Sequence, residues 1–138
     1  MPKQEDATFT QMFSLGRLIR SQIERETTLS LAQLETLRFV YEAGRPSMLE
    51  VAHYHRITAP SATSLVDELV RAKLLTRVSD ARDRRHVRLT LTSSGRRVLK
   101  ASMESRKRVI ESLLTDLGER DRKEFNRLIG NILAAHTK

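Results

Sequence analysis

Hydrophobic residues recur at intervals of three and four along most of this chain, and that spacing predicts a mainly helical protein. Four helices are predicted in the first half, over residues 7–26, 30–44, 48–54 and 58–72, and two more after residue 92. Ser30 and Thr58 are suitable N-caps, and Pro60 is tolerated in the first turn of the fourth helix. The last helix has apolar residues at the i, i+3, i+4 and i+7 positions, which gives it a one-sided apolar face.

Two short segments between residues 75 and 91 break this helical pattern. Residues 75–79 and 86–91 have strand-like composition, with apolar alternation clearest at Val87, Leu89 and Leu91. Two helices joined by a tight turn and followed by a hairpin have the order of a winged helix-turn-helix. We therefore expect one domain over residues 1–138, mainly α with a small β-hairpin wing: a lobe over residues 30–92 and helical regions over residues 7–26 and 93–138.

Positive charge is concentrated around the hairpin. Residues 71–100 contain ten Lys or Arg and two acidic residues, so their net charge of +8 equals that of the whole chain. Localised positive charge is what a phosphate-binding surface requires. The second helix of the pair can enter a DNA major groove. We expect contacts to double-stranded DNA from its outward residues and the arginines that follow: Thr58, Pro60, Ser61, Thr63, Ser64, Arg71 and Arg77.

The order of several short segments resembles the MarR (SlyA-like) family of bacterial transcriptional regulators. The segments are Leu-Ala-Gln-Leu-Glu-Thr-Leu at 31–37, Leu-Val-Asp-Glu-Leu at 65–69, Leu-Leu-Thr-Arg at 74–77, Asp-Ala-Arg-Asp-Arg-Arg at 80–85 and Leu-Thr-Leu-Thr-Ser-Ser-Gly at 89–95. The wing motif Asp-x-Arg-Asp-x-Arg followed by Leu-Thr-x-x-Gly is specific in combination. The resemblance covers essentially the whole chain and implies a homodimer whose two winged lobes read a palindromic operator. We therefore expect a repressor or another regulator of transcription. A cytoplasmic location is expected because the chain shows no secretory hydrophobic segment.

The same resemblance assigns roles to the turn of the hairpin. Arg84 is the candidate for the minor groove, with Arg85 and Arg82 beside it, because the flat arginine cation suits the negative potential of a narrow groove. Asp80 and Asp83 are expected to pair with the arginines and hold the loop in shape.

The chain departs from the family pattern in the helix-turn-helix, where Val-Ala-His-Tyr-His-Arg-Ile stands at 51–57. His55 replaces a commonly buried leucine, and Arg56 replaces a glycine that often makes the turn. Ser64 stands where a basic residue is frequent. Arg56 either contacts a DNA phosphate from the turn or is simply exposed, and the residues leave both alternatives open.

Apolar faces on the terminal helices could form one subunit's core or pack against a second copy. The lobe already has a core of its own, so we expect a homodimer through Phe9, Phe13, Phe125, Leu128, Ile129, Ile132 and Leu133. The family resemblance also implies, in many members, a small aromatic or phenolic ligand between this joint and the lobe. Candidates to border its pocket are Met12, Phe13, Gly16, Leu37 and Tyr41, although such a stripe is more often plain packing.

Several function classes are excluded or disfavoured by the residues. The chain has no cysteine, which removes disulfides and thiolate metal sites. His53 and His55 are two apart on a helix and project to different sides, so we expect no metal and no other cofactor, and a packing role for His55. No phosphate-binding glycine loop or activated nucleophile is evident, so an enzyme is not expected. The chain contains no apolar run of about 18 residues, the length that a membrane span requires.

Two rival functions remain: an architectural or RNA-binding protein, and a module whose hairpin docks an acidic partner.

Overall fold

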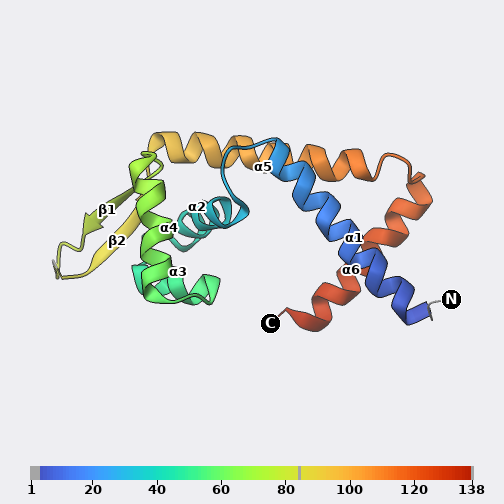
Figure 1. The fold of residues 1–138 in the computed structure, drawn as a ribbon, viewed down its shortest axis with the longest axis horizontal. Helices are drawn as coiled ribbons and strands as arrows, with labels where there is room; N and C mark the ends of the chain where they lie inside the picture. The colour runs from blue at the N-terminus through green and yellow to red at the C-terminus, as the bar shows by residue number, and fades with distance from the viewer. Residues whose placement is uncertain (1–3, 84, 138) are drawn as a thin grey trace.

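The computed structural model describes residues 4–83 and 85–137. Its long helix α5 (Ser93–Leu113) spans the molecule, and the other elements are arranged along it (Figure 1). A lobe surrounds the N-terminal half of α5 and contains three helices and a hairpin: α2 (Leu31–Ala43), α3 (Met48–His55), α4 (Ala59–Arg71), β1 (Leu75–Ser79) and β2 (Val87–Leu91). Two further helices flank its C-terminal half: α1 (Gln4–Arg25) and α6 (Glu119–His136). The predicted fold class, mainly α with a β-hairpin wing, is confirmed.

Each helix that builds the lobe begins at a hydroxyl side chain that accepts a backbone hydrogen bond. The four N-caps are Ser30 for α2, Ser47 for α3, Thr58 for α4 and Thr92 for α5. Such a cap satisfies an N–H that the helix leaves without a partner, and each is worth about 1 kcal/mol. Helix α2 ends at Gly44, whose φ of 62° requires a residue that tolerates the left-handed region.

The hairpin has the register that its alternation predicts. Leu75 pairs with Leu91 and Ser79 with Val87 in an antiparallel ladder. The first strand has the predicted bounds, and the second begins at Val87 rather than at residue 86. Leu89 and Leu91 alternate with exposed or half-buried neighbours and face the core of the lobe, which fixes the side of the hairpin that packs inward.

The core of the lobe draws on every one of its elements. Its members share an exposed fraction below 9%, and the innermost are Leu37, Val40, Val51, Ala62, Val66, Leu69, Leu75 and Leu89. Gly95 closes this core against α5, because a Cβ at that position would lie 2.1 Å from the backbone oxygen of Leu74. Tyr41, which follows the buried Val40 near the end of α2, is 63% exposed.

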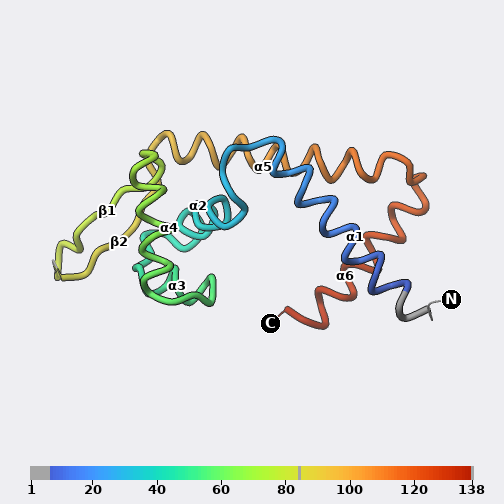
Figure 2. Tube along the Cα trace, in the orientation of Figure 1, coloured from blue at the N-terminus to red at the C-terminus, as the bar shows by residue number. Residues whose placement is uncertain are grey.

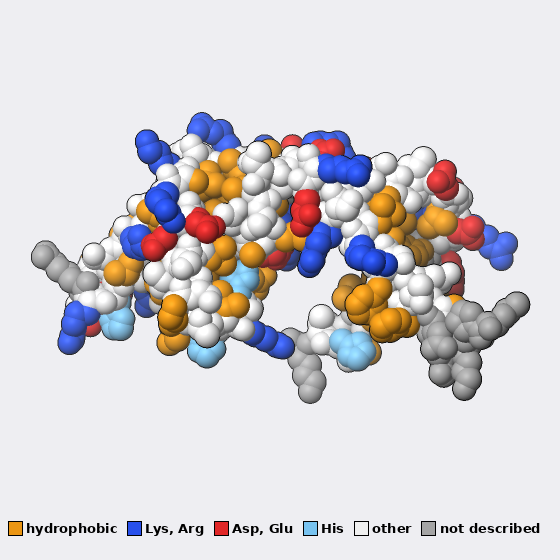
Figure 3. All heavy atoms as spheres, in the orientation of Figure 1, with side chains coloured by type: hydrophobic (Ala, Val, Ile, Leu, Met, Phe, Trp, Pro, Cys, Tyr) orange, Lys and Arg blue, Asp and Glu red, His pale blue; other side chains and the backbone are white. Residues whose placement is uncertain are grey.

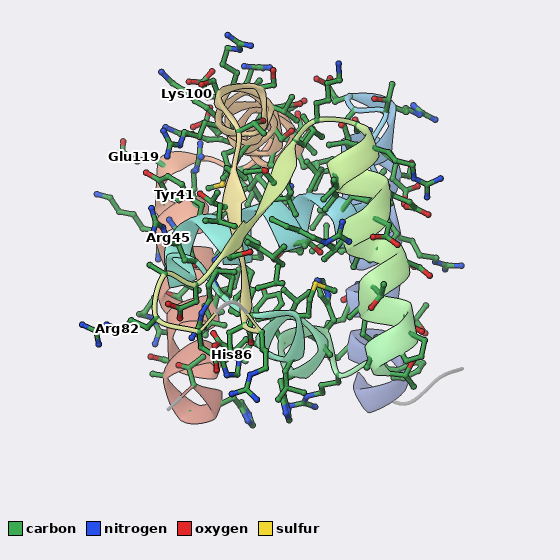
Figure 4. All side chains as sticks on the ribbon, turned by 90° about the vertical axis from the view of Figure 1, so that its left-hand side faces the viewer. Tyr41, Arg45, Arg82, His86, Lys100 and Glu119 are labelled. Atoms are coloured by element: carbon green, nitrogen blue, oxygen red, sulfur yellow. The ribbon has the colours of Figure 1, made fainter. Side chains whose placement is uncertain are left out.

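Helices α1 and α6 have no comparable core. Helix α1 packs on α5, yet it exposes most of its apolar face, and α6 has no buried residue. The two helices cross in Figure 1 and along the trace in Figure 2, but the view in Figure 4 separates them to opposite sides of the molecule. The two apolar faces therefore do not form one subunit's core. No helix in the described ranges combines the length and apolar character needed to cross a bilayer.

Candidate nucleic-acid interface

The turn between α3 and α4 is made without glycine. Arg56 ends α3 with φ 54° and ψ 46°, in the left-handed region, and its N–H donates to the carbonyl of His53 at 3.2 Å. This conformation costs a non-glycine residue about 1 kcal/mol. It directs the chain into Thr58, the cap of α4, and leaves the Arg56 side chain exposed beside the start of that helix.

Helix α4 divides cleanly into a buried and an exposed side. Ala62, Val66 and Leu69 face the core. The side chains expected to contact DNA at its start are all exposed: Thr58, Pro60, Ser61, Thr63 and Ser64. The exposed surface of the first two turns therefore consists of small side chains, which would allow the helix backbone to approach another molecule closely.

The two wing aspartates fold the turn of the hairpin. Asp80 Oδ1 accepts the backbone N–H of Arg82, and Asp83 Oδ1 accepts that of Arg85, both at 3.0 Å. Asp83 also receives the Arg85 guanidinium at 3.2 Å. The backbone hydrogen bond, aided by the side-chain one, lowers the pKa of Asp83, so the carboxylate stays charged and keeps its acceptors in place.

The arginines near the hairpin are not equivalent. Arg82 projects from the tip and forms no ion pair within the described part of the chain (Figure 4). Arg85 is 90% exposed despite its contact with Asp83. Arg77 lies against Asp67 of α4, so it links the wing to that helix instead of standing free. Arg71 is exposed at the end of α4, and Arg84 lies outside the described residues.

The basic segment 71–100 does not form one surface. The labelled side chains of Arg82 and Lys100 lie at opposite ends of the lobe in Figure 4. The start of α5 is tied to the far end of α4, because Thr92 Oγ1 donates to the carbonyl of Lys73 at 2.6 Å. Charges that are neighbours in the sequence are thus split between the wing and the beginning of α5, which the count of basic residues could not predict.

The residues expected to border one ligand pocket lie in three different environments. Met12, Phe13 and Gly16 line a hollow of about 450 Å³ on α1, together with two arginines. Tyr41 lines a separate hollow of about 440 Å³ between α2 and α5, next to Leu99 and Met103. Leu37 is fully buried in the core and borders neither. Within one chain these residues therefore do not border a single cavity, because α1 packs on the other half of α5.

A polar network beneath the lobe has no obvious signal in the sequence. Arg106 of α5 donates to Glu35 of α2 at 2.7 Å, and the Tyr54 hydroxyl of α3 donates to the other Glu35 oxygen at 3.0 Å. Burial by itself would raise the pKa of Glu35, but these hydrogen bonds and the positive charges of Arg106 and Arg38 together more than offset it and lower the pKa. The carboxylate therefore joins three helices whose residues are up to 71 positions apart.

His55, at the end of α3, packs against α2. Thr36 is fully buried, and its hydroxyl donates to the carbonyl of Ala32 at 2.7 Å, so His55 Nε2 at 2.7 Å must be the donor to Thr36 Oγ1. Burial lowers the pKa of His55, while the nearby Glu35 opposes that shift. The packing role expected for His55 is thus the one observed.

Among the described residues, no three His, Asp or Glu side chains gather in a way that could hold a metal ion.

The fold and this surface define a winged helix-turn-helix protein. A model described as MarR family matches residues 27–86. An uncharacterised HTH-type transcriptional regulator of Bacillus subtilis strain 168, YpoP, is 30% identical over 92 residues, a match that spans 65% of this chain and 65% of YpoP. The likeness to the MarR family thus lies in the winged lobe, over residues 27–86, and the comparisons specify no subfamily.

Solved structures share the fold over nearly the whole chain. A mutant of MepR from S. aureus has a TM-score of 0.83 at 20% identity, covering 97% of this chain and 98% of its own. A MarR family protein from Bacillus stearothermophilus has a TM-score of 0.82 at 21% identity, covering 100% and 99%. Another S. aureus MepR mutant, bound to an oligodeoxyribonucleotide, has a TM-score of 0.72 at 20% identity, covering 97% and 99%. At these identities the likeness concerns the fold.

Proposed function

We propose that this protein is a DNA-binding transcriptional regulator, acting as a repressor. The observation that carries the proposal is the pairing of an exposed, small-residue start of α4 with a wing that projects arginine side chains. In a helix-turn-helix, the N-terminal residues of the second helix contact base edges in the major groove. The match of residues 27–86 to the MarR family model supports the same conclusion.

In this proposal each part of the lobe has a separate task on the DNA. Helix α4 enters the major groove, and the wing arginines Arg82, Arg84 and Arg85 enter the adjacent minor groove. Arg56 and Arg71 contact phosphates at either end of α4, which supplies affinity without base specificity. We assign no direct DNA contact to Arg77 in this proposal, because its guanidinium pairs with Asp67.

The protein is proposed to act as a homodimer joined through α1 and α6. Phe9 and Phe13 are 63% and 61% exposed, and Ile132 and Leu133 are each 54% exposed. Figure 3 displays hydrophobic surface on this side of the molecule, away from the lobe. Soluble monomers rarely expose contiguous apolar surface of this kind. Two-fold symmetry would place the recognition helices about 34 Å apart, so the operator is a pseudo-palindrome.

Release from DNA is proposed to follow binding of a small aromatic or phenolic ligand. The apolar hollow lined by Tyr41, Leu99 and Met103 adjoins α5, the helix that connects the lobe to the proposed joint. A ligand can shift the dimer only if it binds the DNA-incompetent form more tightly. A change in α5 would then alter the spacing of the two lobes and their match to successive grooves.

The test is selection of bound duplexes from a random DNA library by the full-length protein at about 150 mM salt. An enriched inverted repeat is expected. Binding without enrichment, together with a steep dependence on salt, would replace the proposal with an architectural role. Absence of binding to duplex DNA would point instead to a protein partner for the wing.

A further inference from the structure

The exposed start of α4 lacks the side chains that usually distinguish guanine and adenine. Arg and Lys recognise guanine, and Asn and Gln recognise adenine, by paired hydrogen bonds to the base edge. The exposed residues of the first two turns include none of these four types: Ala59, Pro60, Ser61, Thr63 and Ser64. This part of the helix therefore cannot form the common bidentate contacts.

Longer polar side chains around this surface are engaged elsewhere. Gln33 accepts the backbone N–H of Ser30 and donates to Glu68, both at 2.9 Å, so its amide is used at both ends. Asp67 is held by Arg77. Arg71 is ten residues beyond Ser61, which is about 15 Å along the helix. Arg56 precedes α4 and is assigned to a phosphate in the proposed function.

The hydroxyl groups at this surface are also partly used within the helix. Thr63 donates its hydroxyl hydrogen to the carbonyl of Ala59 at 3.0 Å, and Thr58 donates its own to Ser61 Oγ at 2.9 Å. Ser61 and Ser64 retain a hydrogen to donate, but a serine hydroxyl pairs with donors and acceptors alike and distinguishes bases weakly. What remains for base recognition is apolar: the Ala59 methyl, the Pro60 ring and the Thr63 methyl.

We propose that the first two turns of α4 recognise thymine C5-methyl groups in the major groove, so that thymines define each half of the operator. Thymine is the base that presents a methyl group there, and Ala and Thr side chains are its usual apolar partners. The small side chains also permit the close approach that methyl contact requires. This inference rests on the proposed function and names the base that its recognition helix selects.

The DNA side of the test uses the operator recovered by the selection described above. Each thymine of a half-site is replaced in turn by deoxyuridine, which removes the methyl and leaves the hydrogen-bonding edge unchanged. Removal of each contacted methyl should weaken binding of the full-length protein by about fourfold. Removal of the equivalent methyl from both half-sites should weaken it by about 16-fold. Deoxyuridine outside the half-sites should leave the affinity unchanged.

The protein side removes the matching methyl from α4. Thr63→Ser keeps the hydroxyl and its bond to Ala59 while deleting the methyl, so it should weaken binding to the thymine operator and abolish one deoxyuridine penalty. Thr115→Ser is the matched control, because Thr115 is exposed and donates to the carbonyl of Glu111 at 3.1 Å in the same way, but near the end of α5. Ala59→Gly deletes the second methyl and should act like Thr63→Ser at a different thymine.

The outcomes separate this inference from the function on which it rests. An enriched inverted repeat whose half-sites lack thymine, or tolerate deoxyuridine at every position, would overturn methyl recognition and leave a sequence-specific regulator. Deoxyuridine penalties that persist in both Thr63→Ser and Ala59→Gly would overturn the assignment to α4. Failure to enrich any sequence would overturn the proposed function and this inference together.

Discussion

The winged lobe and the terminal helices contain amphipathic helices of similar pattern, but they differ in what covers the apolar side. In α4, Ala62, Val66 and Leu69 are completely buried by the rest of the lobe. In α6, Leu128 and Ile132 are 47% and 54% exposed. The comparison teaches that a periodic pattern predicts a helix and its apolar face, whereas the partner of that face depends on where the chain places the helix.

The largest effect is expected from a methyl group added inside the lobe. Gly95→Ala would put its Cβ 2.1 Å from the Leu74 backbone oxygen, and neither backbone can move without separating α5 from the turn after α4. We expect a loss of stability of about 3 kcal/mol or more, measured by denaturant unfolding. Gly130→Ala is the matched control in α6, because nothing lies within 4 Å of its Cβ position in the subunit. Equal stability of the two variants would contradict the contrast between lobe and terminal helices.

A charge on α6 should separate the subunits without unfolding them. Ile132→Asp places a carboxylate on the apolar face while leaving the lobe core untouched, so we expect a helical monomer by sedimentation and circular dichroism. Affinity for a full palindrome should fall at least 100-fold, because the second half-site is then no longer bound intramolecularly. Asn131→Asp adds the same charge at the neighbouring exposed position and should preserve the dimer. A dimer that survives both Ile132→Asp and Leu128→Asp would refute the proposed joint.

Two double substitutions test whether the wing and the start of α5 contribute differently to DNA binding. Arg84→Ala combined with Arg85→Ala should weaken DNA binding roughly 10- to 100-fold at about 150 mM salt and lower the salt slope of the dimer by roughly 3 to 4. Dimerisation and helicity should be unchanged. The control is Arg96→Ala combined with Arg97→Ala, an adjacent pair at the start of α5, which should have little effect on affinity. Similar losses in both pairs would mean that the segment acts as one surface.

The smallest effect concerns the stability of the lobe against acid. The pKa of His55 in the folded protein lies below its ordinary value of 6.5, chiefly because of burial. The unfolded chain therefore binds the proton more readily, and stability should fall as the pH drops below about 6.5 toward the folded pKa. The expected change is a decrease of at most a few degrees in Tm. His55→Leu should remove this dependence, and His53→Leu, at an exposed position, should retain it. A pH profile identical in the native protein and His55→Leu would contradict the assignment.

The sequence predicted the helix caps and the strand alternation of the lobe well, because both depend on interactions that act over a few residues. The hydroxyl caps at Ser30 and Thr58 and the alternation of Leu89 and Leu91 each report local hydrogen bonding or local periodicity. The contacts of Arg77 could not be predicted in this way. Its partner, Asp67, lies ten residues earlier on a different element, and only the packing of the wing on α4 brings the two together.

By itself, the sequence determined the helices, the hairpin and the small exposed residues of α4, because caps, periodicity and side-chain size are properties of short segments. The tertiary structure alone decided that the basic segment is divided between the wing and α5, that Glu35 joins three helices, and that Leu37 and Tyr41 lie in separate environments. These outcomes depend on which distant elements pack together. The free energy of that packing comes from contacts among many residues, so no local pattern predicts it.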